Sequence, residues 1–125
     1  MQSSNQEPGQ RLTGIARLWR AFVNSCNGFS DAIKEETAVQ QECLLLLVAI
    51  PAAFWLTGDT IERVLLVSSV VLVLIVELLN TGIEAAIDRI GTEYHELSGK
   101  AKDVGSAAVL VALCLAAVVW IMILV

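Results

Sequence analysis

One segment of the chain, residues 64–88, begins as an apolar run and ends as a line of acidic side chains. Its first part, VLLVSSVVLVLIV, is apolar apart from two serines. Glu77, Asn80, Glu84 and Asp88 then follow at offsets of 3, 7 and 11 from Glu77. At roughly 100° per residue these four side chains fall within about 80° of one another around a helix. We call this set the polar stripe.

The polar stripe lies in a segment that is otherwise apolar enough to cross a membrane. An ionised carboxylate at the centre of a bilayer costs about 2.5–3.5 kcal/mol on insertion scales, and such side chains face a cavity, a partner subunit or a metal ion. Hydrogen bonding between helices would account for Asn80 alone, but not for three carboxylates. The polar stripe therefore indicates a functional site.

Composition extends this interpretation to the whole chain. The 125 residues are 56% hydrophobic, with a mean hydropathy of +0.70, which is too apolar for a soluble domain. A helix needs about 20 residues to cross the hydrocarbon core. Three segments fit, at residues 37–56, 64–87 and 104–125, so the sequence predicts an all-α integral membrane protein with three spans. The third span begins with small residues, which permit close approach of helices.

Ahead of the first span, residues 12–34 have a helical pattern, with apolar and aromatic residues on one face and basic residues on the other. Such a helix is typical of the membrane interface, and packing against the spans explains the pattern equally well. The apolar face includes Ile15, Leu18, Trp19 and Phe22. Residues 1–10 lack an apolar core and are expected to form a disordered tail.

Basic residues predict the orientation of the spans. Arginines and lysines gather before the first span and in residues 88–103, which we interpret as a loop, whereas the turn at 57–63 has only Arg63. The positive-inside rule then places the N-terminus and this loop in the cytoplasm and the C-terminus in the periplasm. The net charge of −5 and the lack of a broad basic patch exclude nucleic acid as an expected partner.

The chemistry of these groups suits phosphoryl transfer to a lipid alcohol. Carboxylates from several helices can bind a divalent cation, lysine can meet a phosphate, and a deep carboxylate can act as a base. No nucleotide motif supports this, because Ala101 follows Gly99-Lys100 and Tyr94 takes the place of the first P-loop glycine. From the residues alone, a small proton- or cation-coupled transporter is about as good an explanation, and a non-catalytic accessory subunit comes third.

A longer stretch of sequence resembles a known family. Residues 76–109, VELLNTGIEAAIDRIGTEYHELSGKAKDVGSAAV, with RVLL at 63–66 ahead of them, are similar to the integral-membrane diacylglycerol kinases of Gram-negative bacteria. The similarity in length and order of spans covers residues 11–125, which it implies to be one domain. The resemblance implies a homotrimer in the bacterial inner membrane, with active sites shared between subunits. It also implies phosphorylation of diacylglycerol to phosphatidic acid with Mg²⁺ and ATP.

The resemblance implies roles for individual residues as well. Glu77 is expected to be the general base, with Asn80 beside it as a second catalytic residue. Glu36 and Glu84 are expected to hold Mg²⁺. The expected ATP-binding residues are Arg17, Asn24, Glu36, Glu84, Glu93, Tyr94, His95, Lys102 and Asp103. The expected lipid-binding residues are Glu42, Trp55, Arg63, Glu77 and Ser106, and Asp88 is a further polar residue of the site.

Ordinary alternatives exist for several of these roles. His95 in a charged segment also suits a solvated histidine, and Tyr94 and Trp55 also suit anchors at the membrane interface. Asn24 and Cys26 depart from the family pattern, which commonly has aromatic residues there. Because the undecaprenol kinases of Gram-positive bacteria share the fold, undecaprenol kinase is the alternative activity.

Overall fold

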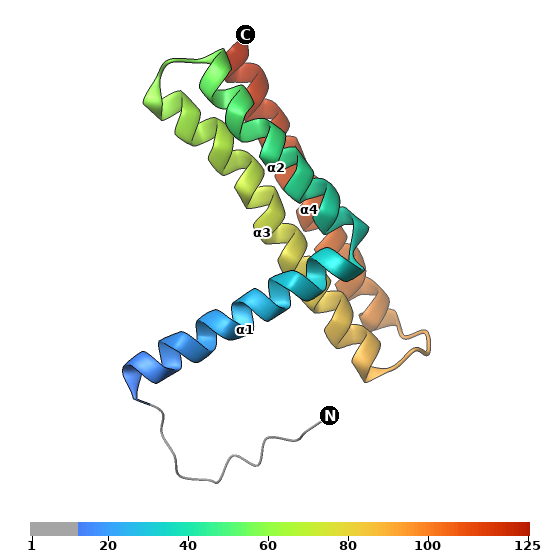
Figure 1. Ribbon diagram of the computed structural model, residues 1–125. Coiled ribbons are helices and arrows are strands. Elements are labelled where there is room, and N and C mark those ends of the chain that lie inside the picture. Colours follow the sequence, from blue (N-terminus) through green and yellow to red (C-terminus); the bar gives the residue numbers. More distant parts are fainter. Residues whose placement is uncertain (1–12) are drawn as a thin grey trace. The chain divides into compact units, whose positions relative to one another are not determined.

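The computed structural model describes residues 13–125, and the regular structure in that range is entirely α-helical (Figure 1). The helices are α1 (Gly14–Glu35), α2 (Thr37–Leu56), α3 (Thr60–Ile90) and α4 (Glu96–Leu124). The chain divides into two compact units, the first ending at Asp31 and the second comprising Ala32–Val125. In the second unit, α2, α3 and α4 are each long and apolar enough to cross a membrane. The predicted all-α fold, with three helices able to span a membrane, is confirmed.

The described part of the first unit is helical. The helix predicted at residues 12–34 is found as α1, while residue 12 and the tail predicted at 1–10 lie outside the described residues. The apolar side chains of α1 are exposed and line a shallow hollow of about 410 Å³. The residues that line this hollow are Ile15, Leu18, Trp19 and Phe22.

In the second unit, α3 is the central helix, since α2 and α4 each pack against it. Its buried apolar side chains are Leu66, Val70, Val73 and Leu74. The buried residues of the flanking helices are mostly small and include Ala49, Ala53, Gly105 and Ala112. Small residues let the helix backbones approach closely, which is how helices gain packing energy where lipid competes for apolar contact.

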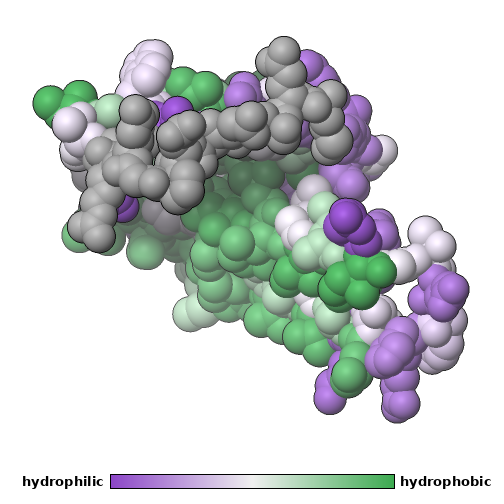
Figure 2. Space-filling view, turned by 90° about the horizontal axis from the view of Figure 1, so that it is seen from below, coloured by the Kyte–Doolittle hydropathy of each residue, from purple (hydrophilic) through white to green (hydrophobic). Residues whose placement is uncertain are grey.

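Large apolar side chains remain exposed along all three helices of the second unit. Figure 2 shows hydrophobic residues on the flank of this unit and hydrophilic residues gathered near the connection between α3 and α4. An apolar surface of this extent marks contact with a membrane or with other protein chains. Together with the lengths of the helices, this surface indicates a membrane protein.

The segment 88–103, predicted to be a loop, is mostly helical. Only residues 91–95 separate α3 from α4, which starts eight residues before the predicted third span. His95 caps this start, because its Nδ1 accepts a hydrogen bond of 3.1 Å from the Leu97 N–H. Glu96 in the first turn complements the positive end of the helix dipole. The prediction was wrong because a high density of charge marks exposure to water rather than a loop.

The turn between α2 and α3 is held by side chains from both sides. Asp59 caps α3, accepting a hydrogen bond of 3.0 Å from the Glu62 N–H. Arg63 reaches back to the end of α2, where its Nε donates to the Thr57 carbonyl at 2.9 Å and its Nη2 to the Phe54 carbonyl at 3.1 Å. Its guanidinium also lies 4.7 Å from the centre of the Phe54 ring. These contacts close the hairpin of α2 and α3.

A tryptophan near the end of α4 contacts the first third of α3. The Trp120 Nε1 donates to the Leu66 carbonyl at 3.1 Å and to Ser69 Oγ at 3.2 Å. Ser69 Oγ in turn donates to the same carbonyl at 2.8 Å. This contact fixes how far α4 is shifted along α3.

The helices of the second unit also differ in length. At about 1.5 Å per residue, the 31 residues of α3 span about 46 Å, whereas the 20 residues of α2 span about 30 Å. Val39 near the start of α2 packs in one cluster with Leu74. Roughly the last dozen residues of α3 therefore continue past the start of α2, accompanied by the start of α4, as Figure 1 shows. We call these parts, residues 79–90 and 96–107, the overhang.

Candidate active site

The polar stripe runs from the packed part of α3 into the overhang. Glu77 and Asn80 are buried, each with 7% of its surface exposed, while Glu84 is half-buried and Asp88 is exposed. The stripe extends about 16 Å along the helix axis. Its inner end is therefore enclosed by the neighbouring helices and its outer end is open to solvent.

Asn80 connects α4 with the outer half of the stripe. Its Nδ2 donates a hydrogen bond of 3.3 Å to Glu84 Oε1. Its Oδ1 is buried, and no donor among residues 13–125 reaches it. This oxygen lies against Gly105 of α4, where an added Cβ would stand only 2.3 Å away. A side chain added at residue 105 would therefore require the Asn80 amide to move.

The start of α2 adds two further carboxylates. Glu42 is buried, with 9% of its surface exposed, and its Oε2 likewise has no donor in the described part of the chain. Glu42 and Glu77 lie near enough for their charges to interact. The charges of Glu84 and Glu36 also act on Glu77. The structure thus brings the predicted base and the two predicted metal ligands into one acidic region, the acidic cluster, consisting of Glu36, Glu42, Glu77 and Glu84.

The donor atoms of the acidic cluster fit a magnesium ion that is bound together with phosphates. Mg²⁺ prefers oxygen ligands and is usually held by one or two carboxylates, with substrate phosphates completing its coordination. Glu36 and Glu84 are half-buried, so each keeps some exposed surface for a ligand. Within residues 13–125 no group of three or more His, Cys, Asp or Glu side chains is placed to hold a metal ion. A magnesium ion at this site would therefore take most of its ligands from phosphates and water.

An ion pair lies at the exposed edge of the site. Lys102 Nζ lies 2.7 Å from Asp88 Oδ1, and the side chains are 42% and 64% exposed, respectively. Exposed pairs contribute about 0.2–1 kcal/mol, so this lysine can exchange its partner for a phosphate at little cost. Asp103 beside it is exposed.

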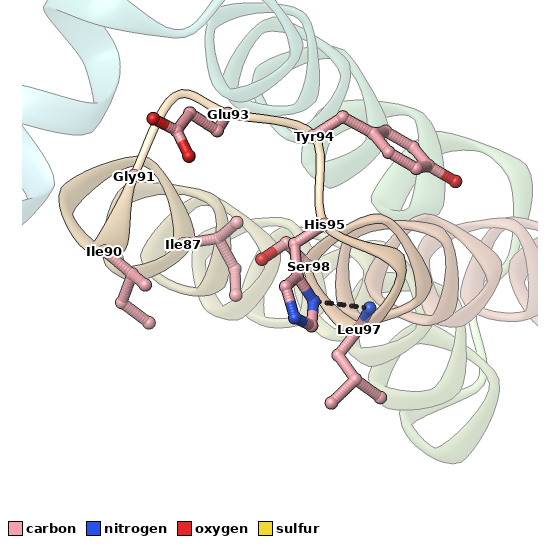
Figure 3. Close-up of a pocket in the computed structure, with 8 residues that line it drawn as sticks. All are labelled: Ile87, Ile90, Gly91, Glu93, Tyr94, His95, Leu97 and Ser98. Atoms are coloured by element: carbon pink, nitrogen blue, oxygen red, sulfur yellow. Dashed lines mark hydrogen bonds between the residues drawn. The ribbon is translucent and has the colours of Figure 1, made fainter.

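A hollow of about 370 Å³ lies at the tip of the overhang (Figure 3). It is lined by Glu93, Tyr94 and His95 together with Ile87, Ile90, Gly91, Leu97 and Ser98. Figure 3 shows the Glu93 and Tyr94 side chains pointing in opposite directions from the connecting segment. Because His95 Nδ1 accepts a hydrogen bond, the neutral ring carries its proton on Nε2, where it can donate to a ligand.

The remaining predicted site residues belong to other parts of the chain. Arg63 precedes Glu77 by about 21 Å along α3, and its donors are engaged in the turn. Trp55, near the same turn, is 87% exposed. Ser106 is exposed on α4, directly after Gly105. Arg17 and Asn24 belong to the first unit, where both are exposed.

Sequence reasoning missed the contact partners of two residues, Gly105 in the site and Trp120 near the end of α4. The small residues at the start of the third span predicted a close approach, which the structure confirms at Gly105, but they gave no partner for it. No pattern in the sequence predicted the contact of Trp120 with Leu66 and Ser69.

Comparison with known proteins decides the family. The family profile described as prokaryotic diacylglycerol kinase matches residues 23–124. The chain belongs to this family. The match includes the whole of α2, α3 and α4 and the entire polar stripe. The family and the class of enzyme, a lipid kinase, are thereby as the sequence predicted.

Three relatives, each named diacylglycerol kinase, show how far the similarity extends. The protein of Escherichia coli strain K12 is 53% identical over 112 residues, covering 90% of this chain and 92% of the relative. That of Haemophilus influenzae is 48% identical over 110 residues, covering 88% and 93%. That of Pseudomonas aeruginosa is 46% identical over 117 residues, covering 94% and 95%.

Proposed function

We propose that this protein transfers the γ-phosphoryl group of ATP to the free hydroxyl of diacylglycerol, giving phosphatidic acid and ADP. The observation that carries the proposal is the burial of Glu77 at the inner end of the polar stripe, in a chain of the prokaryotic diacylglycerol kinase family. A carboxylate buried between apolar helices of a membrane protein is placed to meet a lipid alcohol. The exposed outer end of the stripe is placed to meet a nucleotide.

Glu77 acts as the general base. Its carboxylate takes the proton of the lipid hydroxyl, whose oxygen forms a bond to the γ-phosphorus, and the bond from that phosphorus to the β–γ bridging oxygen breaks. ADP leaves with the electron pair of that bond. Such transfers depend mainly on positioning and electrostatic stabilisation. Asn80 supports both, because it lies one turn below Glu77 and holds Glu84.

Glu36 and Glu84 would hold Mg²⁺ beside the phosphates of ATP. When bound, the ion would supply positive charge for the transferring phosphoryl group. Both carboxylates act on Glu77 electrostatically, which supports their place in the same site.

The nucleotide lies along the outer end of the stripe and the tip of the overhang. Lys102 leaves Asp88 to meet a phosphate, and Asp103, Glu93, Tyr94 and His95 contribute further contacts. The hollow beside His95 and the weak, exposed pair of Lys102 with Asp88 support this placement. The family resemblance also assigns Arg17 and Asn24 to the binding of ATP.

The lipid extends from Glu77 toward the turn between α2 and α3. Glu42, Ser106, Trp55 and Arg63 line its path, and the 21 Å from Glu77 to Arg63 is compatible with the length of acyl chains. The enzyme resides in the bacterial inner membrane, with its N-terminus and the connection between α3 and α4 in the cytoplasm and its C-terminus in the periplasm. α1 lies in the interface, where its exposed apolar residues meet lipid.

The protein acts as a homotrimer with shared sites. Glu36 and Glu84 are only half-buried within one chain, and half-buried carboxylates next to hydrocarbon are costly. A neighbouring copy against this side would shield them from lipid.

Phosphate transfer from γ-labelled ATP tests the proposal. Purified protein in micelles is offered diacylglycerol or undecaprenol, and Glu77→Gln is compared with Glu62→Gln, which makes the same change near the opposite end of α3. We expect the native protein and Glu62→Gln to place label in phosphatidic acid and Glu77→Gln to place none. The Glu77→Gln variant should remain a trimer, because the substitution keeps the shape of the side chain. Label in undecaprenyl phosphate alone would move the substrate to the other lipid. A trimer that binds ATP yet labels neither would refute the kinase and lead to measurements of ion flux.

A further inference from the structure

Gly105 differs from the other glycines of the described residues in what surrounds it. A Cβ added at Gly105 would stand 2.3 Å from Asn80 Oδ1 and 3.4 Å from Asn80 Cγ. At the other glycines, such as Gly82, an added Cβ would meet nothing closer than an ordinary contact. The close approach at Gly105 is to a polar side chain of the active site, and not to an apolar neighbour.

Asn80 has little freedom to move away from an added side chain. Its amide is buried, and its Nδ2 already holds Glu84 at 3.3 Å, near the upper limit of a hydrogen bond. Ordinary contact with a Cβ begins at 3.4 Å, so the oxygen would have to retreat by about 1 Å. Because the amide is planar and rigid, a movement of that size at one end displaces the other end as well. The hydrogen bond to Glu84 would then be lost.

We infer that Gly105 is a positioning residue of the phosphoryl-transfer site: its missing side chain seats the Asn80 amide, and Asn80 in turn orients Glu84. This inference rests on the proposed function, in which Asn80 and Glu84 take part in the reaction. A misplacement of 1 Å among catalytic groups can reduce the rate about 100-fold. A residue with no functional group thus controls the turnover of the enzyme from the neighbouring helix.

Gly105→Ala, compared with Gly82→Ala, tests the inference. Both changes add one methyl group inside a helix and raise helix propensity by about the same amount. Gly82→Ala meets nothing within 4 Å and is the matched control. We expect Gly105→Ala to lower kcat about 10- to 100-fold and to raise the magnesium requirement, while KM for diacylglycerol changes less than about threefold. Activity equal to that of Gly82→Ala would overturn the inference.

A double-mutant cycle separates positioning from packing. Asn80→Ser shortens the side chain and removes the steric conflict, so adding Gly105→Ala to it is expected to reduce activity by less than about twofold. If Asn80→Ser turns over too slowly to measure, a binding assay replaces turnover. The rise in the thermal unfolding midpoint on adding Mg-ATP is then compared among the native protein, the two single variants and the double variant. Equal losses from Gly105→Ala in both backgrounds would overturn the inference. Native protein that phosphorylates no lipid would refute the proposed function instead.

Discussion

Removing the hydrogen bonds of Trp120 provides a direct measure of how strongly α4 is joined to α3. Trp120→Phe keeps an aromatic ring but deletes the N–H that reaches the Leu66 carbonyl at 3.1 Å and Ser69 Oγ at 3.2 Å. Neither acceptor is left without a partner, because Ser69 Oγ itself donates to that carbonyl at 2.8 Å. The cost is therefore that of a single hydrogen bond between membrane helices, about 0.6 kcal/mol on average and at most about 1.7.

We expect Trp120→Phe to lower the free energy of unfolding by about 1 kcal/mol, a factor of roughly five in the unfolding equilibrium. The assay is reversible unfolding in mixed micelles at increasing fractions of a denaturing detergent, followed by far-ultraviolet circular dichroism because the mutation alters fluorescence. Trp55→Phe is the matched control, since Trp55 is 87% exposed, and its cost should be near zero. Equal costs for the two variants would refute the assigned hydrogen bonds. A cost above about 3 kcal/mol would refute the argument that both acceptors remain satisfied.

Three further predictions concern the two ends of α3. Asp88→Asn is expected to lower the free energy of unfolding by about 0.2–1 kcal/mol at low salt and by less in 1 M salt, because the pair with Lys102 is exposed; a salt-independent loss would contradict this. Glu84→Gln is expected to raise the magnesium concentration for half-maximal turnover about 10-fold or more, since even indirect partners of a metal contribute that much; an unchanged titration would remove Glu84 from the metal site. Arg63→Lys cannot reach both carbonyls at the end of α2 and is expected to destabilise the protein by about 1 kcal/mol in the same unfolding assay; an unchanged stability would show that the two bonds are incidental.

The sequence predicted the spans well because apolar length is a strong signal that depends on local composition alone. The end of α3 and the start of α4 were not predicted, since the criterion was hydrophobicity and both helices continue into a charged region. The His95 cap, which defines the start of α4, is recognisable only once the chain after it is known to be helical.

For the site, helical periodicity correctly placed the polar stripe on one helix, because offsets of 3, 7 and 11 refer to a single rigid element. Contacts between helices carry no such periodicity. The shift of α4 along α3 sets Gly105 against Asn80, and no property of either residue alone selects the other. The proximity of Glu36 to Glu77 likewise follows from where α2 meets α3. The resemblance to the family supplied the residues, and the fold supplied their neighbours.

The overhang gives the two halves of the site different local stabilities. Glu77 lies where α2, α3 and α4 all pack, whereas the residues around Glu93 and Lys102 are supported by two helices and one exposed ion pair. Segments with fewer buried contacts open more often, so amide hydrogens of residues 84–102 should exchange with deuterium sooner than those of residues 66–80. The base is thereby held in a rigid frame, while the groups that face the nucleotide can adjust as ATP enters and ADP departs.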